Sequence, residues 1–317
     1  MRGLFLDIDT VDRGDLDLAG LRATLPEWTF RQGGAGKTWE QPLQADIIVS
    51  NKVAVDADTI NGAADLKLIC IAATGTNNVD LAAAAKRGVP VCNVRSYATA
   101  SVVEHVFSLM LCLARSLPQY IRAVEHSEWQ KSNTFCMLDY PVMELAGRTL
   151  GIIGCGELGS AVAAMGQAFD MQVLMAERRG RTVRHGRTPL DEVLAHADII
   201  SIHCPLNTDT QNLIGAAELH SMKRDALLIN TARGGIINEG DLANALLSGE
   251  IGGAALDVLA EEPPHAGNLL LSLDLPNLII TPHIAWASSN SRQRLVDEIA
   301  ANIQAFLAGE PRNIVAT

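Results

Sequence analysis

Residues 149–159 read TLGIIGCGELG, and this stretch decides the fold. A short apolar run leads into Gly154, Gly156 and Gly159, which are spaced as Gly-x-Gly-x-x-Gly, and residues 160–169 continue as a helical pattern. In such a strand–turn–helix unit the first glycine permits the tight turn and the second lets the backbone approach a pyrophosphate. The third lets the helix pack against the strand. Because a helix N-terminus also favours phosphate, the stretch predicts a dinucleotide site.

An acidic residue follows the next predicted strand. Residues 172–176 predict a strand that ends at Glu177, 18 residues after Gly159. An acidic side chain at this place accepts hydrogen bonds from the adenine ribose diol, which favours NAD. Arg178 and Arg179 come next, and an arginine here could pair with the 2′-phosphate of NADP or lie in a solvated loop. We predict NAD, with NADP as the alternative.

Apolar runs alternate with helical patterns on both sides of this motif. The predicted strands are residues 3–8, 47–49, 68–72 and 89–92, then 149–154, 172–176, 199–203, 226–230, 253–257 and 278–281. Such alternation predicts parallel sheets covered by helices. The fold class is therefore α/β, with two Rossmann-like doubly wound parallel-sheet domains and a cleft between them.

The domain boundaries follow from two helical stretches. Residues 101–117 are strongly apolar and contain no Gly or Pro, which predicts one buried helix. Residues 291–307 are amphipathic, and we expect this helix to return and complete the short N-terminal series. We predict a discontinuous substrate-binding domain of residues 1–99 plus 285–317, and a dinucleotide-binding domain of residues 100–284.

Bulk composition excludes several classes of protein. The net charge of -11 argues against non-specific nucleic-acid binding, which depends on clustered Lys and Arg. No stretch approaches the roughly 18 to 20 apolar residues that span a bilayer, and the first residues do not form a secretory signal. The six cysteines form no Cys-x-x-Cys pair and are expected to be reduced, so we predict a cytoplasmic protein without a metal site.

Three polar groups follow predicted strands, where open α/β sheets bind ligands. They are Arg233 in LINTARGG, Glu262 in ALDVLAEEPP and His283 in IITPHIAWAS. Arg233 suits the carboxylate of a 2-oxo acid, because its planar fork pairs with carboxylates. His283 suits proton transfer near neutral pH, and Glu262 would orient the imidazole and favour its protonated form. Alone, each residue could be an ordinary surface or core group, but together they predict catalysis.

At this point the sequence resembles the D-isomer-specific 2-hydroxyacid dehydrogenases over nearly the whole chain. The motifs GCGELG, HCPLNTDT (203–210), NTARGG, ALDVLAEEPP and TPHIAWAS carry the resemblance in order and spacing. It implies that Arg233, Glu262 and His283 are catalytic; Glu262 rather than Glu261 is chosen because it directly precedes a proline. It also implies a D product, domain closure and a homodimer. The helix over residues 101–117 and the segment 119–142 could supply the dimer contact, unless the helix belongs entirely to the core of its own domain.

The resemblance extends to the binding residues. It implies that Asp257 contacts the nicotinamide carboxamide. The further cofactor-binding residues implied are Thr99, Gly154, Gly156, Glu157, Leu158, Gly159, Glu177, Arg178, Cys204, Pro205, Thr210, Thr231 and Ala232. The substrate-binding residues implied are Asn51, Ala73, Thr74, Gly75 and Trp286, together with Arg233 and His283.

Within the family, AATGTNNVD (72–80) and TPHIAWAS are most similar to glycerate dehydrogenases, also called hydroxypyruvate reductases. Trp286 beside the catalytic histidine would favour short substrates such as hydroxypyruvate or glyoxylate, unless it packs at a domain or subunit junction. Two alternatives stay open. One is a D-lactate or phosphoglycerate dehydrogenase. The other is a dinucleotide-sensing corepressor, against which the acidic charge and the lack of long tails weigh.

Overall fold

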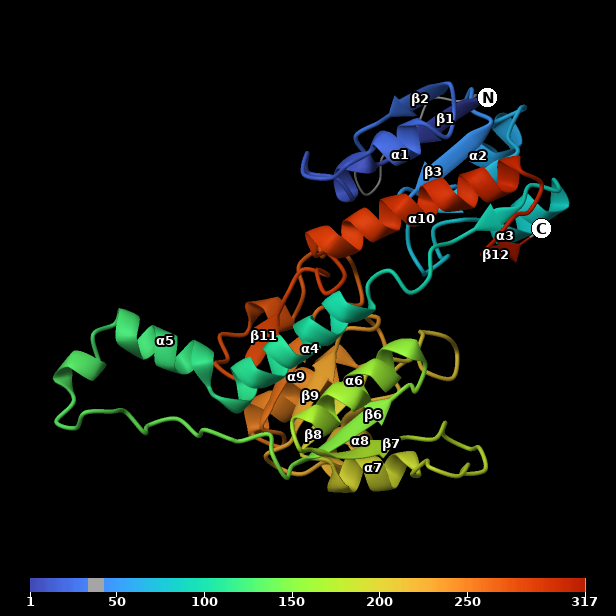
Figure 1. Cartoon of the computed structure of the whole chain (residues 1–317). Helices are drawn as coiled ribbons and strands as arrows, with labels where there is room; N and C mark the ends of the chain where they lie inside the picture. The colour runs from blue at the N-terminus through green and yellow to red at the C-terminus, as the bar shows by residue number, and fades with distance from the viewer. Residues whose placement is uncertain (34–42, 317) are drawn as a thin grey trace. The chain divides into compact units, whose positions relative to one another are not determined.

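The computed structural model describes residues 1–33 and 43–316, which divide into two compact units. Unit 1 is Met1–Ala98 with Trp286–Thr317, and unit 2 is Thr99–Ala285. Each unit is built on one six-stranded sheet (Figure 1). The α/β prediction with two Rossmann-like domains is confirmed. The functions that the sequence assigned to the two domains stay predictions.

The sheet of unit 1 has the strand order β12-β5-β4-β3-β1-β2. Every neighbouring pair is parallel except β12 and β5. The strands are β1 (Arg2–Phe5), β2 (Glu27–Phe30), β3 (Ile47–Ser50), β4 (Leu68–Ile71), β5 (Val91–Cys92) and β12 (Ile314–Ala316). The helices are η1 (Ile8–Thr10), α1 (Ala19–Arg22), α2 (Ala57–Gly62), α3 (Leu81–Lys86) and α10 (Ser289–Leu307).

Helix α10 returns to the N-terminal unit, as the sequence predicted. It contacts α1 and β4 and buries Leu295, Val296 and Ile299. Figure 1 shows it in red beside the blue and cyan strands of unit 1. The Ser288 side chain accepts a hydrogen bond from the N–H of Ser291, which caps the helix N-terminus and fixes where it begins.

The sheet of unit 2 has the order β11-β10-β9-β8-β6-β7 and is parallel throughout. Its strands are β6 (Thr149–Ile153), β7 (Gln172–Met175), β8 (Ile199–Ile202), β9 (Leu227–Asn230), β10 (Gly253–Leu256) and β11 (Leu278–Ile280). Its helices are α4 (Thr99–Ala114), α5 (Leu117–Glu125), η2 (Trp129–Lys131), α6 (Glu157–Ala168), α7 (Leu190–His196), α8 (Ala216–Ser221), α9 (Glu239–Ser248) and η3 (Leu270–Ser272).

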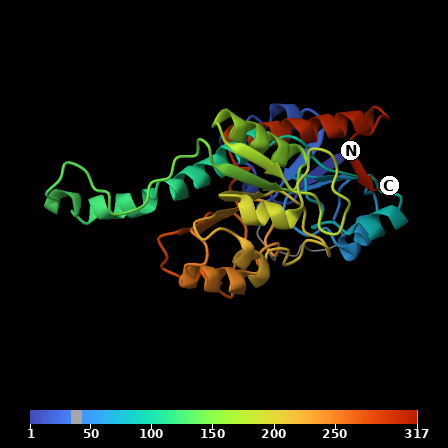
Figure 2. The ribbon, with the colours of Figure 1, turned by 90° about the horizontal axis from the view of Figure 1, so that it is seen from below.

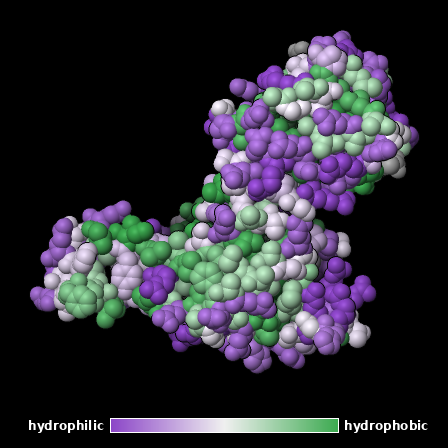
Figure 3. Space-filling model, viewed as in Figure 1, coloured by the Kyte–Doolittle hydropathy of each residue, from purple (hydrophilic) through white to green (hydrophobic). Residues whose placement is uncertain are grey.

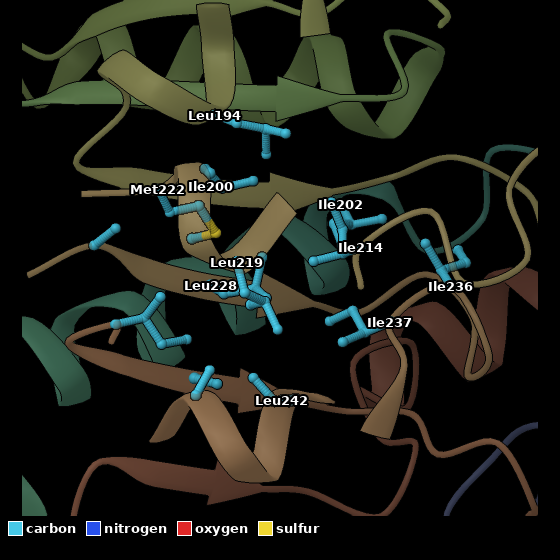
Figure 4. Close-up of a cluster of buried hydrophobic side chains, with 14 of the residues drawn as sticks. Leu194, Ile200, Ile202, Ile214, Leu219, Met222, Leu228, Ile236, Ile237 and Leu242 are labelled. Carbon is cyan, nitrogen blue, oxygen red and sulfur yellow. The ribbon is translucent and has the colours of Figure 1, made fainter. Parts of the chain in front are cut away.

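Helices cover both faces of the second sheet. Leu150 of β6 lies under Gly166 of α6, and the next strand residue, Gly151, lies under Val193 of α7. Because neighbouring strand residues point to opposite faces, α6 and α7 pack on opposite sides. Figure 4 shows the core on the α7 side, where aliphatic side chains such as Ile200 gather between strands and helices. The strands are thus buried on both faces, as parallel sheets require.

The prediction of one helix over residues 101–117 is wrong at its C-terminal end. Helix α4 ends at Ala114, and Ser116 adopts a left-handed backbone with φ 48°. A new helix, α5, begins at Leu117 with Pro118 in its first turn, where a missing N–H costs little. Residues 118–125, for which no helix was predicted, therefore belong to a separate helix.

Residues 117–142, which we call the arm, extend from the rest of unit 2 (Figures 1 and 2). They comprise α5, η2 and an extended return. Among the described residues, no single helix is long and apolar enough to cross a bilayer. The bent pair of α4 and α5, at 62°, meets only the length and composition criteria, and most of α4 is buried within the protein.

Candidate active site

The glycine-rich turn of unit 2 is shaped by close backbone contacts. Gly154 has φ 95°, and a Cβ at this position would overlap the backbone of His203 and Cys204. A Cβ at Gly159 would overlap the carbonyl oxygen of Gly154. Gly156, in contrast, caps α6 and has no atom within 4 Å of its would-be Cβ. The packing of the turn therefore requires glycine at positions 154 and 159, whereas the space beside Gly156 is open.

A pocket of about 400 Å³ opens beside this turn, between the carboxyl ends of β6, β7 and β8. Seven of the predicted cofactor residues line it: Gly154, Gly156, Glu177, Arg178, Cys204, Pro205 and Thr210. The Thr210 hydroxyl donates to the Pro205 carbonyl at 2.6 Å, which closes the loop after β8. The sequence motifs at the ends of three strands thus meet in one cavity.

Glu177 lies at the end of the second strand, as predicted, but its carboxylate already has partners. Arg184 donates from Nε to Oε2 at 2.6 Å and from Nη2 to Oε1 at 2.8 Å. The backbone N–H of Arg178 donates to Oε1 at 2.9 Å. The Arg184 guanidinium and this N–H hold the pKa of Glu177 at about 2. No sequence motif pointed to Arg184, because it lies seven residues after Glu177 in an exposed loop.

His203 is a pocket residue that the sequence argument did not select. Burial lowers its pKa to about 4, so the ring is neutral at neutral pH. Its Nε2 lies 2.8 Å from the Ser201 hydroxyl. Its Nδ1 is buried and has no hydrogen-bond partner among the described residues. A buried ring nitrogen of this kind at the cavity wall suits a polar ligand.

The remaining predicted cofactor residues lie outside this cavity. Glu157 and Leu158 form the first turn of α6, where Glu157 accepts a hydrogen bond from the Thr99 hydroxyl. Thr231 and Ala232 follow β9, and the Thr231 hydroxyl is buried with no partner among the described residues. The open space at Gly156, the pocket of about 400 Å³ beside it and the unpaired buried Thr231 hydroxyl after β9 fit a dinucleotide.

Glu262 and His283 form a close pair. Glu262 Oε2 lies 2.6 Å from His283 Nδ1, while Oε1 accepts the backbone N–H of Leu259 at 2.8 Å. The side chains are 27% (His283) and 32% (Glu262) exposed, so a small molecule can reach them. The carboxylate is held by the backbone on one side and orients the imidazole on the other. A histidine whose ring is held by a carboxylate in this way can act as a general acid.

Arg233 lies on the neighbouring strand end. Arg233 Nη1 donates to the Ala232 carbonyl at 2.7 Å, and Asn230 Nδ2 donates to the Arg233 carbonyl at 2.8 Å. The next residue, Gly234, packs against Leu259 so closely that a Cβ would overlap the Leu259 carbonyl. The turn after β9 therefore contacts the loop that carries Glu262. Since β9, β10 and β11 are adjacent, parallel strands, the three predicted catalytic residues share one sheet edge.

Asp257, at the end of β10, holds the loop that carries His283. Its Oδ1 accepts the N–H of Ile284 at 2.9 Å, and its Oδ2 accepts the N–H of Ala285 at 2.8 Å. Its own carbonyl accepts the N–H of His283 at 2.8 Å. His283 has φ 55°, a left-handed conformation that needs such support. The contact with a nicotinamide carboxamide that resemblance implied stays a prediction beside this structural role.

A second histidine supports this loop. His105 of α4 places Nε2 3.0 Å from the Thr281 hydroxyl and 3.5 Å from Asp257 Oδ1. Burial alone would raise the pKa of Asp257, but hydrogen bonds from His105, Thr281 and the loop backbone more than offset this and lower it. The sequence argument missed His105, although a lone histidine inside the apolar run SVVEHVF was a visible signal.

The predicted substrate residues of unit 1 lie in the loops after its strands. Asn51 follows β3 and is buried, with Nδ2 donating to the Thr10 hydroxyl at 2.9 Å. Ala73, Thr74 and Gly75 follow β4, and Asn93 Nδ2 donates to the Thr74 carbonyl at 2.7 Å. Trp286 packs edge-on against Tyr97, with ring centroids 6.3 Å apart.

Among the described residues, no group of three His, Cys, Asp or Glu side chains is placed to hold a metal ion.

Comparison with known proteins places these features in a family. Residues 107–285 match the family model described as the D-isomer specific 2-hydroxyacid dehydrogenase NAD binding domain. The chain is 46% identical to a glycerate dehydrogenase of Methylorubrum extorquens over 95% of its own length and 97% of that protein.

Two solved structures share the whole fold. One is a D-lactate dehydrogenase from Aquifex aeolicus complexed with NAD and lactic acid, with a TM-score of 0.83, 28% identity and 99% of both chains covered. The other is an NADPH-dependent glyoxylate/hydroxypyruvate reductase from Sinorhizobium meliloti, with a TM-score of 0.80 and 26% identity, covering 99% of this chain and 96% of that one. The chain belongs to the D-isomer specific 2-hydroxyacid dehydrogenase family and is an oxidoreductase with an NAD-binding domain.

Proposed function

We propose that this protein reduces a short 2-oxo acid of the hydroxypyruvate or glyoxylate type to the D-2-hydroxy acid. The observation that carries the proposal is the Glu262–His283 pair, 2.6 Å apart, on the sheet edge that also carries Arg233. The similarity to a glycerate dehydrogenase at 46% identity supports the substrate class. The bound cofactor supplies the hydride.

The chain's own residues divide the remaining work. Arg233 binds the substrate carboxylate through its planar guanidinium, which also polarises the neighbouring carbonyl. His283 donates a proton to the carbonyl oxygen as negative charge develops there. Glu262 fixes the ring and stabilises its protonated form. Asn51, Ala73, Thr74, Gly75 and Trp286 are the proposed further substrate contacts.

A substitution of His283 tests this assignment. His283→Ala removes the proton donor, and we expect turnover to fall about 1,000-fold, because general acid catalysis contributes about 10² to 10⁴ in rate. The control is His196→Ala, which removes an exposed histidine of α7. Cofactor affinity, measured by titration calorimetry, should be unchanged in both variants. Near-normal turnover in His283→Ala would refute the role.

Substitution of Arg233 tests the carboxylate contact. Arg233→Ala should raise KM for the 2-oxo acid and lower kcat, since it removes a charge-assisted pair worth about 2 kcal/mol or more. Arg233→Lys keeps the charge but loses the bidentate geometry, and we expect only partial recovery. Unchanged kcat and KM in Arg233→Ala would exclude this contact.

We also propose that two copies of the chain associate through the arm. Exposed apolar side chains concentrate on it: Ile121 (56% exposed), Phe135 (91%) and Leu138 (83%). Figure 3 shows hydrophobic surface along the arm and the adjoining face of unit 2. Such a patch is costly in water unless a partner covers it. Light scattering should give a dimer for the wild type and a monomer for Phe135→Ser/Leu138→Ser; a wild-type monomer would refute the proposal.

A cytoplasmic location is proposed from the unpaired cysteines.

A further inference from the structure

The loop after β7 carries an unusual concentration of positive charge. Five arginines line the pocket there, against only two carboxylates, Glu177 and Asp209. The chain as a whole has a net charge of -11, so this local excess runs against the general balance. His203, with its pKa lowered to about 4 by burial, adds no charge at neutral pH. The pocket is therefore positive at the end of the second strand.

The acidic group expected to bind the ribose diol is not available as a simple acceptor. Both oxygens of Glu177 accept hydrogen bonds from Arg184, at 2.6 and 2.8 Å, and the side chain is only 3% exposed. A free carboxylate at this position repels a 2′-phosphate and selects for a ribose with two hydroxyls. A carboxylate neutralised by a bidentate guanidinium loses most of that repulsion.

Three of the arginines have no acidic partner. Arg179 is paired, 2.9 Å from Glu218. Across residues 1–33 and 43–316, no carboxylate lies within ion-pair distance of Arg178, Arg181 or Arg187. We call these three residues the arginine triplet. All three residues line the same cavity.

Arg187 ties this group to the glycine-rich turn. Its Nη1 is buried and has no hydrogen-bond partner among the described residues. Burial raises the pKa of the Cys155 thiol, and the nearby Arg187 guanidinium partly offsets that rise. Cys155 lies between Gly154 and Gly156, so Arg187 sits beside the cofactor-binding turn. A buried, unsatisfied guanidinium nitrogen calls for an acceptor that the chain itself does not provide.

We propose that the arginine triplet forms a subsite for the 2′-phosphate of NADP(H), and that Arg184 neutralises Glu177 to admit it. The inference rests on the proposed function only in using the same dinucleotide site. A phosphate monoester offers three acceptor oxygens and up to two negative charges, which match several guanidinium groups. NADPH, rather than NADH, is then the preferred reductant, contrary to the preference for NAD predicted from Glu177 in the sequence.

Binding without substrate tests the subsite directly. Titration calorimetry on the full-length protein would compare NADPH with NADH, and adenosine 2′,5′-bisphosphate with 5′-AMP. We expect each 2′-phosphorylated ligand to bind at least about tenfold more tightly than its partner, because one or more charge-assisted hydrogen bonds are added. The difference should shrink as salt is raised, since exposed charges are screened. Equal affinities, or tighter binding of NADH, would overturn the proposal.

Variants of the loop assign the effect to residues. Arg187→Gln, and separately Arg178→Gln/Arg181→Gln, should each weaken NADPH binding about tenfold and leave NADH binding within about twofold. The control is Arg224→Gln, which removes the same charge from an exposed position outside the pocket. If both loop variants bind NADPH like the control, the triplet does not hold the phosphate and the proposal is wrong. Melting temperatures confirm that each variant is folded.

The same data separate this inference from the proposed function. Preferential NADPH binding with no turnover of any 2-oxo acid would support the subsite and refute the substrate assignment. Efficient turnover of hydroxypyruvate with NADH, together with weak NADPH binding, would support the substrate assignment and refute the subsite.

Discussion

The two units share the same strand order but differ at the place where that order changes direction. In each sheet the first strand lies between the second and third strands of its unit, with the fourth, fifth and sixth beyond the third. This change of direction is the place where open α/β sheets bind ligands. In unit 2 the chain leaves β6 through Gly154 and keeps open space at Gly156.

In unit 1 a buried carboxylate, that of Asp7, occupies the corresponding place after the first strand. Asp7 follows β1 and is fully buried. Its two oxygens accept the backbone N–H groups of Asn51, Lys52 and Val53, the loop after β3, at 2.6 to 2.9 Å. A side chain thus satisfies the N–H groups that an anionic ligand would otherwise meet. The two units therefore share a strand order, but the loop after the first strand carries a buried carboxylate in unit 1 and a glycine-rich turn in unit 2.

The sixth strands differ as well. In unit 2, β11 runs parallel to β10, so its carboxyl end lies beside those of β9 and β10 and delivers His283 to the same edge. In unit 1, β12 runs antiparallel to β5, and its carboxyl end lies at the opposite edge of the sheet. An edge formed by the carboxyl ends of the fourth, fifth and sixth strands is therefore present in unit 2 and absent from the described part of unit 1.

Replacing Asp7 should have the largest effect, on the stability of the protein, because it removes the carboxylate that binds the loop after β3. Asp7→Ala leaves three backbone N–H groups without their acceptor, and we expect the free energy of unfolding to fall by about 3 to 5 kcal/mol. Urea denaturation followed by circular dichroism measures this. The exposed Asp58→Ala is the control and should change stability by less than about 0.5 kcal/mol. If Asp7→Ala lowered the free energy of unfolding as little as the control does, the carboxylate would not support the loop.

Filling the open space at Gly156 of unit 2 should weaken dinucleotide binding strongly without destabilising the fold. Gly156→Val adds a side chain into space that no protein atom fills, so we expect an unchanged melting temperature. We expect dinucleotide affinity to fall about 100-fold, or about 2.7 kcal/mol, because the side chain occupies the phosphate site. Gly154→Val, in which the side chain overlaps Cys204, should instead destabilise the protein. Full cofactor affinity in Gly156→Val would place the phosphates elsewhere.

A smaller effect, on kcat, is expected when the contacts that hold the loop after β11 are removed. His105→Ala removes the contacts to Thr281 and Asp257, and we expect kcat to fall about tenfold through a loosened His283 loop. KM for the cofactor should stay within about twofold. His105→Gln can restore one hydrogen bond and should recover part of the loss, which a general loss of stability would not show. An unchanged kcat would mean that Asp257 holds the loop alone.

The smallest effect concerns stability against pH. Glu177 has a pKa of about 2 in the folded protein, below its ordinary 4.5, because of Arg184. A depressed carboxyl pKa stabilises the fold above pH 4.5, and that contribution is lost as pH falls from about 4.5 toward 2. The melting-temperature difference between wild type and Glu177→Gln should therefore shrink over this range. A difference that stays constant from pH 6 to pH 3 would contradict the ion pair.

Sequence patterns predicted the strands of unit 2 well because both faces of that sheet are buried, which makes each strand a continuous apolar run. Strand β2 in unit 1 was not predicted, since Glu27–Phe30 lies at the sheet edge and alternates polar and apolar residues over only four positions. Strand β12 was missed for a similar reason, as a three-residue edge strand. Boundaries set by edge pairing are weakly encoded in local sequence.

The site shows the same division between local and distant information. The glycine-rich turn and the Glu262–His283 pair follow motifs, so their positions could be read from spacing. The partner of Glu177 could not, because a loop conformation brings Arg184 back onto the strand end. His105 reaches Thr281 across 176 residues of sequence, a contact that no local pattern encodes.

The most direct test of the central claim is a substrate panel. Initial rates of NADPH and NADH oxidation would be measured with hydroxypyruvate, glyoxylate, pyruvate and a phosphorylated 2-oxo acid, for wild type and His283→Ala. We expect the highest kcat/KM for hydroxypyruvate or glyoxylate, with turnover lost in His283→Ala. Preference for the phosphorylated acid or pyruvate, or no turnover with any of them, would contradict it.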